Sequence, residues 1–498
     1  MRSRLDEVPL LVVFIGATGL LMLVPSAKAF IDLDAAIGRA FFYSALITVV
    51  AAIFLAIALL GQRRNSRTDR LFPLLTAIYL LVPAAMALPM AESLPQMRFV
   101  DAWFEMISSF TTTGASLIDL PRRVPEAVHL WRGMAGWMGG LFILSAATAL
   151  LAPLRLGGFE LIQRDSAAVT RIGATTQPPG ARLRAHTTVI FPAFLGLTLV
   201  LWVLLTIAGV PAFDALMQAM ATLSTSGILP REALGGVGLG AEVLLFAFMI
   251  LALSRRFLPG HGGRPKPIQQ DPELLTAAAI VVLVSLFVVL RHWAGAFDVR
   301  EGENLPAMGR AAWGAGFTSL SFLTTTGFVS QDWIASRVWS GLTPPGLVLM
   351  GLALLGGGAA TTAGGIKLLR VYALTRLGKA EAERLIYPSI VTGGHEYDRF
   401  LATTGARSAW LFAMVFALTA VAVVALLLLS GMSLETSLIF TVAGLANTGP
   451  LVQVAGELPL HWVLLSDPAR AVLALAMILG RLEILVFLAL ILGRAQRD

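Results

Sequence analysis

The sequence predicts an all-α integral membrane protein with about ten spanning helices. Of its 498 residues, 57% are hydrophobic and only 13% are charged, and the mean hydropathy is +0.79. A helix needs about 20 apolar residues to cross a bilayer, and residues 274–290 and 411–429 are two runs of suitable length. The chain has no cysteine, which excludes disulfides, thiolate nucleophiles and cysteine metal sites.

Basic residues stand in short clusters between the apolar runs, within a net charge of +7. They form no stripe with interleaved aromatic residues, so the composition does not indicate nucleic-acid binding. The positive-inside rule places these clusters and both basic termini in the cytoplasm, which requires an even number of spans. The clusters are Arg63, Arg64, Arg67 and Arg70; Arg155, Arg164, Arg171, Arg182 and Arg184; Arg255, Arg256, Arg264 and Lys266; and Lys367, Arg370, Arg376, Lys379 and Arg384.

The N-terminus has an alternative reading as a cleavable signal peptide, because a basic start precedes its apolar run. That run is long for a signal, and residues 41–60 form a natural hairpin partner for it. We therefore predict an N-terminal transmembrane hairpin over residues 1–65.

The rest of the chain repeats one arrangement four times. Each copy has an apolar span, a segment of about ten residues that is too short to cross a bilayer, a polar stretch closed by glycine, and a second span. The short segments with their polar stretches are residues 101–116, 213–229, 313–329 and 434–451. A recurring unit of this kind predicts four pseudo-symmetric pore repeats around a central pore, at residues 66–158, 186–262, 270–378 and 398–498.

The polar stretches have the chemistry of a cation filter. Non-helical backbone at membrane depth is tolerated where it lines a polar cavity, and carbonyl and hydroxyl oxygens from four loops can replace the water shell of an ion. Glycine, which lacks Cβ, lets those carbonyls point inward. The predicted filter residues are Thr111, Thr112, Thr113 and Gly114; Ser224, Thr225, Ser226 and Gly227; Thr324, Thr325, Thr326 and Gly327; and Ala446, Asn447, Thr448 and Gly449.

The short helices before these loops direct their negative C-terminal ends towards the pore axis, which favours a cation there. We place four carboxylates at the outer ends of three of them: Asp101, Glu105, Asp214 and Glu435. A single Thr-Thr-Thr-Gly is more often a polar turn or a packing patch, but four copies in equivalent positions favour a pore.

A glycine-rich stretch, residues 356–370, interrupts the span after the third polar stretch. Glycine costs about 1 kcal/mol against alanine inside a helix, so the helix should break there. A phosphate-binding loop is the rival interpretation, but the stretch has no Gly-Lys-Ser/Thr ending and no preceding buried strand.

With these motifs the sequence resembles the Trk/Ktr/HKT superfamily of K+ transporters, and the TrkH/TrkG-type membrane subunits in particular. The resemblance covers nearly the whole chain and implies potassium uptake across the cytoplasmic (inner) membrane of a bacterium through a filter-bearing, gated pore. Glycine in the first filter strand, here Gly114, goes with K+ preference in this family. The resemblance also implies a homodimer and a cytoplasmic TrkA-type regulatory subunit that holds the nucleotides, so this chain needs no cofactor beyond the transported K+.

Two further sites follow from the resemblance. The glycine-rich stretch becomes a gating loop beneath the filter, with residues Gly356, Gly357, Gly358, Thr361, Thr362, Gly364, Gly365 and Lys367. In "LGRLEILVF", Arg481 projects into the cavity below the filter as an electrostatic barrier to cations, while snorkelling to the interface is its alternative role. Glu483 points in another direction from Arg481 and has a separate partner.

Alternatives to a simple K+ pore stay open at this level. Ser226 and the fourth loop, Asn-Thr-Gly-Pro, depart from the family pattern, so a Na+-permeable transporter of the same fold is one alternative. An H+- or Na+-coupled K+ symporter is another, although coupled transporters usually have inverted repeats and these four share one orientation. The six histidines have no metal-ligand spacing and no Ser/His or paired-acid constellation recurs, so the sequence predicts that the protein is not an enzyme.

Overall fold

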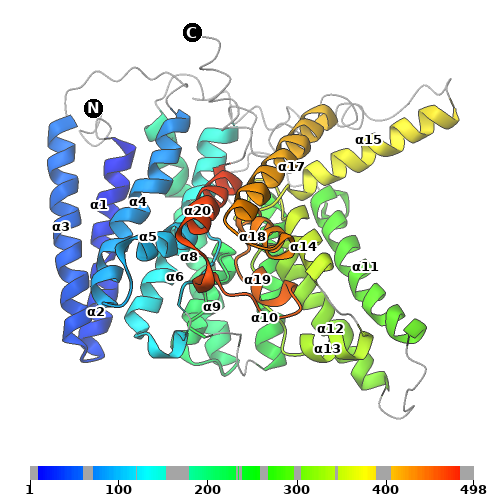
Figure 1. The fold of residues 1–498 in the computed structure, drawn as a ribbon, viewed down its shortest axis with the longest axis horizontal. Helices are drawn as coiled ribbons and strands as arrows, with labels where there is room; N and C mark the ends of the chain where they lie inside the picture. The colour runs from blue at the N-terminus through cyan, green and yellow to red at the C-terminus, as the bar shows by residue number, and fades with distance from the viewer. Residues whose placement is uncertain are drawn as a thin grey trace, which may run out of the picture.

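The computed structural model describes residues 9–59, 71–118, 120–152, 179–231, 234, 238–257, 267–295, 304–341, 346–387 and 405–482, and these form helices joined by turns and loops, with no strand among them. Figure 1 shows the long helices standing side by side, with α15 leaving the bundle at one end. The prediction of an all-α membrane protein is confirmed: seven helices in the described part are long and apolar enough to span a bilayer. Their exposed sides carry large apolar residues, as Phe54 and Leu418 illustrate.

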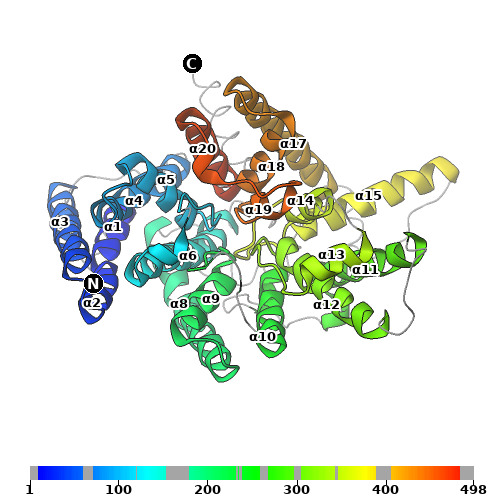
Figure 2. The same ribbon diagram turned by 60° about the horizontal axis from the view of Figure 1, so that its bottom comes forward.

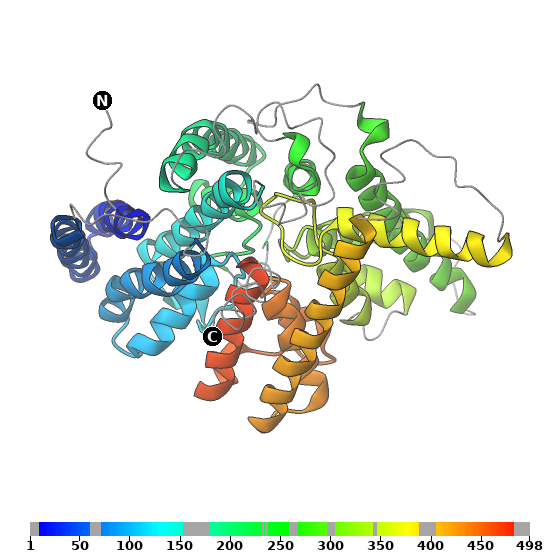
Figure 3. The same cartoon turned by 90° about the horizontal axis from the view of Figure 1, so that it is seen from above.

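The N-terminal hairpin consists of α1 (Leu10–Leu21), α2 (Leu23–Ile31) and α3 (Ala35–Leu59). The first two continue each other and together make one span of 22 residues. Figure 3, a view along the bundle, places this hairpin at the edge of the molecule.

The remaining spans and short helices form four units. They are α4 (Leu71–Ser93), α5 (Phe99–Phe110) and α6 (Glu126–Ala146, continued by a π-helix over Ala147–Leu151); α8 (Pro179–Ile207), α9 (Ala212–Ser224) and α10 (Leu239–Met249, continued by a 3-10 turn over Ile250–Leu253); α11 (Pro272–Gly295), α12 (Asn304–Leu323) and α14 (Gly346–Leu355); and α17 (Ala406–Leu429), α18 (Leu434–Leu445) and α20 (Asp467–Leu482). Three further helices lie between these elements: α13 (Trp333–Ser340), α15 (Leu368–Ile386) and α19 (Leu451–Ala455).

The units contact one another in a cycle. In every unit the middle helix packs against both flanking helices. The third helix of each unit also contacts the middle helix of the next unit, in the pairs α6 with α9, α10 with α12, α14 with α18 and α20 with α5. The last pair closes the ring, and Figure 2 shows the inter-helix loops meeting inside it. One expectation was wrong: α12 has 20 residues and is not the ten-residue segment that the other units suggested.

Glycines on the third helices permit close approach of the middle helices. An ideal Cβ on Gly139 of α6 would lie 1.9 Å from the Phe110 carbonyl oxygen, and one on Gly140 would lie 2.8 Å from Ser224 Cβ. Gly480 on α20 stands in the same relation to Leu445, at 2.2 Å from its carbonyl oxygen. Small residues of this kind let helix backbones pack closely in a membrane, and here they bring α6 and α20 against the ends of the short helices.

Candidate functional site

The four middle helices end with the same backbone geometry. One or two residues beyond the last residue of each helix, the backbone is in the left-handed region, at Thr112 (φ 55), Thr225 (φ 52), Thr325 (φ 58) and Asn447 (φ 54). The next amide then donates to a carbonyl five residues earlier in the helix, over 2.8–3.0 Å, in the pairs Thr113 to Ser108, Ser226 to Ala221, Thr326 to Ser321 and Thr448 to Ala443. This is the Schellman motif, which usually has glycine in the left-handed position.

We call the four predicted filter segments glycine loops 1–4: residues 111–114, 224–227, 324–327 and 446–449. A threonine in the left-handed region costs roughly 1–2 kcal/mol, so this cost recurs in loops 1–3, whereas the asparagine of loop 4 adopts the conformation more readily. Such strain persists where the surrounding structure fixes the backbone. Sequence reasoning placed the special backbone angles on the glycines alone and missed this position, because threonine carries no glycine-like signal.

The glycines that close the loops serve two purposes. Gly114, Gly227 and Gly327 have φ values of 74, 63 and 81, which suit a residue without Cβ. Gly449 has no positive φ but allows contact between loops: its amide donates to the Thr113 carbonyl over 2.6 Å, and an ideal Cβ on it would lie 2.3 Å from the Ala115 nitrogen.

The four loops converge and touch in ring order. An ideal Cβ on Gly114 would lie 2.0 Å from the Ser226 carbonyl oxygen, and one on Gly227 would lie 2.3 Å from the Thr326 carbonyl oxygen. Pro450, which follows loop 4, packs against both Gly227 and Gly327, and Gly449 contacts loop 1 as described above. The structure therefore brings together the residues that the sequence analysis assigned to a filter.

The hydroxyl groups of loops 1–3 bond within their own loop. The first and third residues of each loop are joined, with distances of 2.8 Å for Thr111 to Thr113, 3.0 Å for Ser224 to Ser226 and 3.0 Å for Thr324 to Thr326. The first hydroxyl also donates to the carbonyl four residues earlier in the helix. Loop 4 has Ala446 at its first position and instead uses Asn447, whose Nδ2 donates to Thr113 Oγ1 over 2.9 Å. These bonds stiffen the loops and link loop 4 to loop 1.

The predicted outer carboxylates divide into three that lie where expected and one that does not. Asp101, Asp214 and Glu435 are in the first turns of α5, α9 and α18. Glu105 lies inside α5 and is fully buried, so its placement at the outer end was wrong. It forms an ion pair with Arg132 of α6 over 2.6 Å and accepts the Leu117 amide over 2.6 Å, behind glycine loop 1.

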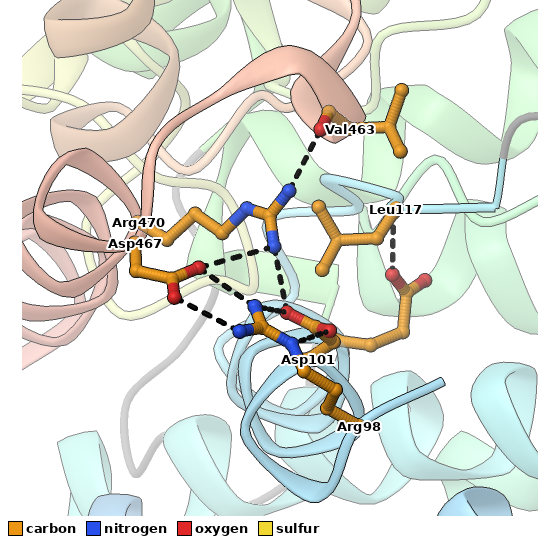
Figure 4. Close-up of polar contacts among 7 residues, drawn as sticks. Arg98, Asp101, Leu117, Val463, Asp467 and Arg470 are labelled. Carbon is orange, nitrogen blue, oxygen red and sulfur yellow. Dashed lines mark hydrogen bonds and ion pairs between the residues drawn. The ribbon is translucent and has the colours of Figure 1, made fainter. Parts of the chain in front are cut away.

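A cluster of four charges joins α5 to α20 at their N-terminal ends (Figure 4). Arg98 donates to Asp101 over 2.8 Å and to Asp467 over 2.7 and 2.9 Å. Arg470 donates to Asp101 over 2.6 Å and to the Val463 carbonyl over 2.7 Å. These bonds clamp the first and fourth units together. Because two arginines face two aspartates, the cluster presents no net charge to an ion.

Acid should loosen this clamp. The hydrogen bond from Arg98, with Arg470 beside it, holds the pKa of Asp101 below its ordinary value. A carboxyl whose pKa is lower in the folded state contributes stability above its unfolded pKa of about 4, and loses it as the pH falls through the folded pKa. We expect the melting temperature in detergent to fall below about pH 4 more steeply for the wild type than for Asp101→Asn. Parallel acid profiles for the two proteins would contradict this role.

The break in the third unit's last span is confirmed: α14 ends at Leu355, α15 begins at Leu368, and we call residues 356–367 between them the break loop. It contacts three of the four glycine loops. The Thr225 hydroxyl donates to the Thr362 carbonyl over 2.8 Å, and the Gly364 amide donates to the Thr325 hydroxyl over 2.7 Å. An ideal Cβ on Gly364 would lie 2.0 Å from the Ala446 carbonyl oxygen. In Figure 3 this segment reaches from α15 to the centre of the ring.

Side chains at its ends hold the break loop in place. Glu273, buried at the start of α11, accepts the Ala359 amide over 2.6 Å. Lys367, with φ 86, donates its ammonium to the Ala363 carbonyl. Arg370 is fully buried and lies over the Phe412 ring of α17 at 3.8 Å from its centroid. The sequence analysis named Lys367 and Arg370 near this loop but missed Glu273, which lies 86 residues before Ala359 at the start of the same unit.

Arg481 lies near the end of the described part of α20 and is 4% exposed. Its Nε and Nη2 atoms have no hydrogen-bond partner among the residues that the structure describes, and Tyr79 of α4 is a polar neighbour. One turn earlier on the same helix, the Met477 carbonyl accepts Asn447 Nδ2 over 2.9 Å, so this part of α20 lies beside glycine loop 4. Its burial argues against snorkelling. Glu483 lies outside the described residues.

No group of three or more histidine, aspartate or glutamate side chains is placed to hold a metal ion within the described ranges. The oxygen-rich part of the site is instead backbone, supplied by the ends of four helices.

Comparisons with known proteins agree with this geometry. Residues 274–495 match the TrkH family, described as a cation transport protein. The Trk system potassium uptake protein TrkH of Vibrio parahaemolyticus is 28% identical over 409 residues, which cover 80% of this chain and 79% of that protein. The Trk system potassium uptake protein TrkG of Escherichia coli is 29% identical over 444 residues, covering 86% and 85%. The crystal structure of the potassium transporter TrkH from Vibrio parahaemolyticus has the same fold, with a TM-score of 0.80 over 98% of both chains at 24% identity.

Proposed function

We propose that this chain, a relative of the TrkH-type Trk system proteins, is a potassium uptake pore of the cytoplasmic membrane. The observation that carries the proposal is the ring of four helix ends with one common geometry, whose glycine loops touch in cyclic order. The relatives are named as potassium uptake proteins of the Trk system, and K+ is the ion we assign to the ring. The alternative is a transporter of the same fold that couples K+ to H+ or Na+ or admits Na+.

Glycine loops 1–4 would form the selectivity filter. Four helices direct the negative ends of their dipoles towards the loops, which favours a cation at the centre. Backbone carbonyls held in a rigid ring can replace the hydration shell of K+. The hydroxyl groups that bond within loops 1–3 would keep those carbonyls at fixed spacing. Since each helix supplies one loop, the four pore repeats predicted from the sequence supply one filter strand apiece, and the cyclic contacts of the helices support this division.

The break loop would be the gate. It rests on glycine loops 2, 3 and 4, so an ion leaving the ring on that side meets it first. Arg481, buried beside loop 4 with donor atoms that lack partners in the described chain, would place a positive charge on the same path and slow cations electrostatically.

The subunit arrangement is inferred from the relatives and the charge pattern. We assign both termini and the basic connections to the cytoplasm, where a TrkA-type nucleotide-binding subunit would act on the gate. The break loop continues directly into α15, whose basic residues Arg376 and Lys379 would lie on that side. Two copies of this chain would form a homodimer in the membrane. Nucleotides would bind the partner, so this chain acts as a pore and not as an enzyme.

Ion flux into proteoliposomes tests this function. With the membrane potential clamped, we expect uptake of K+ and Rb+ to exceed that of Na+ by at least tenfold, as a filter of rigid carbonyls implies. The uptake should follow the electrochemical potential of the transported ion at any pH gradient. Uptake that stops when both the H+ and Na+ gradients are removed would establish the coupled symporter instead. Equal K+ and Na+ uptake would refute the assignment of K+.

A further inference from the structure

Glycine loops 1 and 3 are held from behind by a contact that loops 2 and 4 lack. In unit 1, Glu105 of α5 accepts the amide of Leu117, twelve residues further along the chain, over 2.6 Å. In unit 3, the Thr318 hydroxyl of α12 accepts the amide of Ser330, again twelve residues later, over 3.4 Å. Both contacts join the middle helix to the extended segment that follows the loop, three residues past its glycine.

The equivalent positions in the other two units cannot make this bond. In unit 2 they are Gln218 and Pro230; proline has no N–H to donate, and the buried Gln218 Oε1 has no hydrogen-bond partner in the described part of the chain. In unit 4 the helix position is Phe440, which packs against Trp462 at 4.8 Å between ring centroids. Trp462 Nε1 donates to the Gly449 carbonyl over 3.2 Å, so loop 4 has a neutral support.

Buried charge strengthens the two anchored loops. Behind loop 1, Glu105 pairs with Arg132, which also donates to the Ser116 hydroxyl over 2.8 Å. Behind loop 3, the buried Glu242 of α10 accepts the Ser330 hydroxyl over 2.9 Å and the Gln331 amide over 2.8 Å.

Glu242 also accepts the Trp313 indole N–H over 2.8 Å. Both oxygens of each carboxylate thus accept hydrogen bonds, and hydrogen bonds to ionised groups are shorter and about twice as strong as neutral ones. Loops 1 and 3 stand opposite each other in the ring, because the units that carry them alternate with units 2 and 4 in the cycle of helix contacts.

We propose that Glu105 and Glu242 are positioning residues for ion selectivity, an inference that rests on the proposed pore function. The two carboxylates fix the segments that follow glycine loops 1 and 3, and so fix the width of the ring along one diameter. No carboxylate anchors loop 2 or loop 4 in this way within the described residues, and these two loops accommodate the ion along the other diameter. Discrimination between K+ and the smaller Na+ depends on how firmly the carbonyls keep their positions, so it depends on these two anchors, although neither side chain touches the ion.

The test compares three variants in the proteoliposome assay. Glu105→Gln and Glu242→Gln keep an oxygen that can accept the same amides but remove the charge. Each should raise the Na+/K+ permeability ratio about tenfold, the change that corresponds to about 1.4 kcal/mol, while K+ uptake continues. Gln218→Met is the matched control, since it changes the same helical position in unit 2, where no amide is bound. It should leave the ratio unchanged.

Folding and function are separated by two further arms. Glu105→Gln leaves Arg132 buried without its carboxylate, so the permeability ratio of the double variant Glu105→Gln/Arg132→Met is measured as well. Glu242 accepts only neutral donors among the contacts above, so Glu242→Gln tests the inference without leaving a buried cation unpaired. Wild-type ratios in folded Glu105→Gln/Arg132→Met and Glu242→Gln proteins, or an equal rise in Gln218→Met, would overturn the inference and leave the pore intact. Absence of cation-selective uptake in the wild type would overturn the proposed function and this inference together.

Discussion

Replacing Gly114 with serine is expected to abolish the preference of the pore for K+ over Na+. Two effects act together at this position. The left-handed backbone, with φ 74, costs a side-chain residue roughly 1–2 kcal/mol. The new Cβ would also lie 2.0 Å from the Ser226 carbonyl oxygen, so glycine loop 2 must move. Because that carbonyl belongs to the ring proposed to bind the ion, the damage falls on selectivity first, and the Na+/K+ uptake ratio should approach one.

Gly209 provides a matched control for the backbone effect. It also has a positive φ, of 93, but an ideal Cβ there meets nothing within 4 Å, and it lies beyond the end of α8, away from the ring. Gly209→Ser should lower the melting temperature and keep selective uptake. If both variants kept their selectivity while remaining folded, glycine loop 1 would not be part of the filter. If both lost it, the cause would be backbone strain in general and not the contact with Ser226.

The sequence predicted the features that are carried by composition and repetition. Apolar runs predicted the helices, four polar stretches predicted the converging loops, and glycines in residues 356–370 predicted the break between α14 and α15. The resemblance to TrkH-type proteins, stated on those motifs, agrees with the relatives found. These signals are local, so a single chain displays them.

The contacts between units could not be predicted in the same way. Nothing local marks Thr112 as a left-handed residue, since threonine favours other conformations and only the closure of the ring holds it there. Glu105 was wrongly assigned to a helix end. Its partner Arg132 lies on the next helix, and a pairing across 27 residues leaves no pattern in the sequence that would have shown its buried position. Glu242 accepts an amide of the next unit, 89 residues later, and Glu273 accepts an amide of its own unit 86 residues later, so neither role shows in a local pattern.

Releasing the break loop should open the pore. Two hydrogen bonds hold the break loop in place without involving any residue of the glycine loops. Glu273 accepts the Ala359 amide over 2.6 Å, and the Thr362 hydroxyl donates to the Leu223 carbonyl over 3.1 Å. The double variant Glu273→Ala/Thr362→Val removes both bonds and leaves the buried Ala359 amide without its acceptor. Losing a buried partner costs about 1–3 kcal/mol, and the cost applies to the closed loop alone.

The expected result is a rise in K+ uptake, because a closed state that is weakened by about 2–3 kcal/mol gains roughly 30-fold to 150-fold in its open fraction when opening is rare. Selectivity should stay at the wild-type value, since glycine loops 1–4 are unchanged. Thr361→Val is the control: the Thr361 hydroxyl donates to the Gly358 carbonyl inside the break loop over 2.8 Å, so its loss leaves the docking bonds in place. K+ uptake by the two variants is compared in proteoliposomes without any partner subunit.

A folded double variant that conducts no faster than Thr361→Val would mean that the break loop is not the gate. Faster but unselective uptake would mean that the loop also supports the filter through its contacts with Thr225 and Thr325.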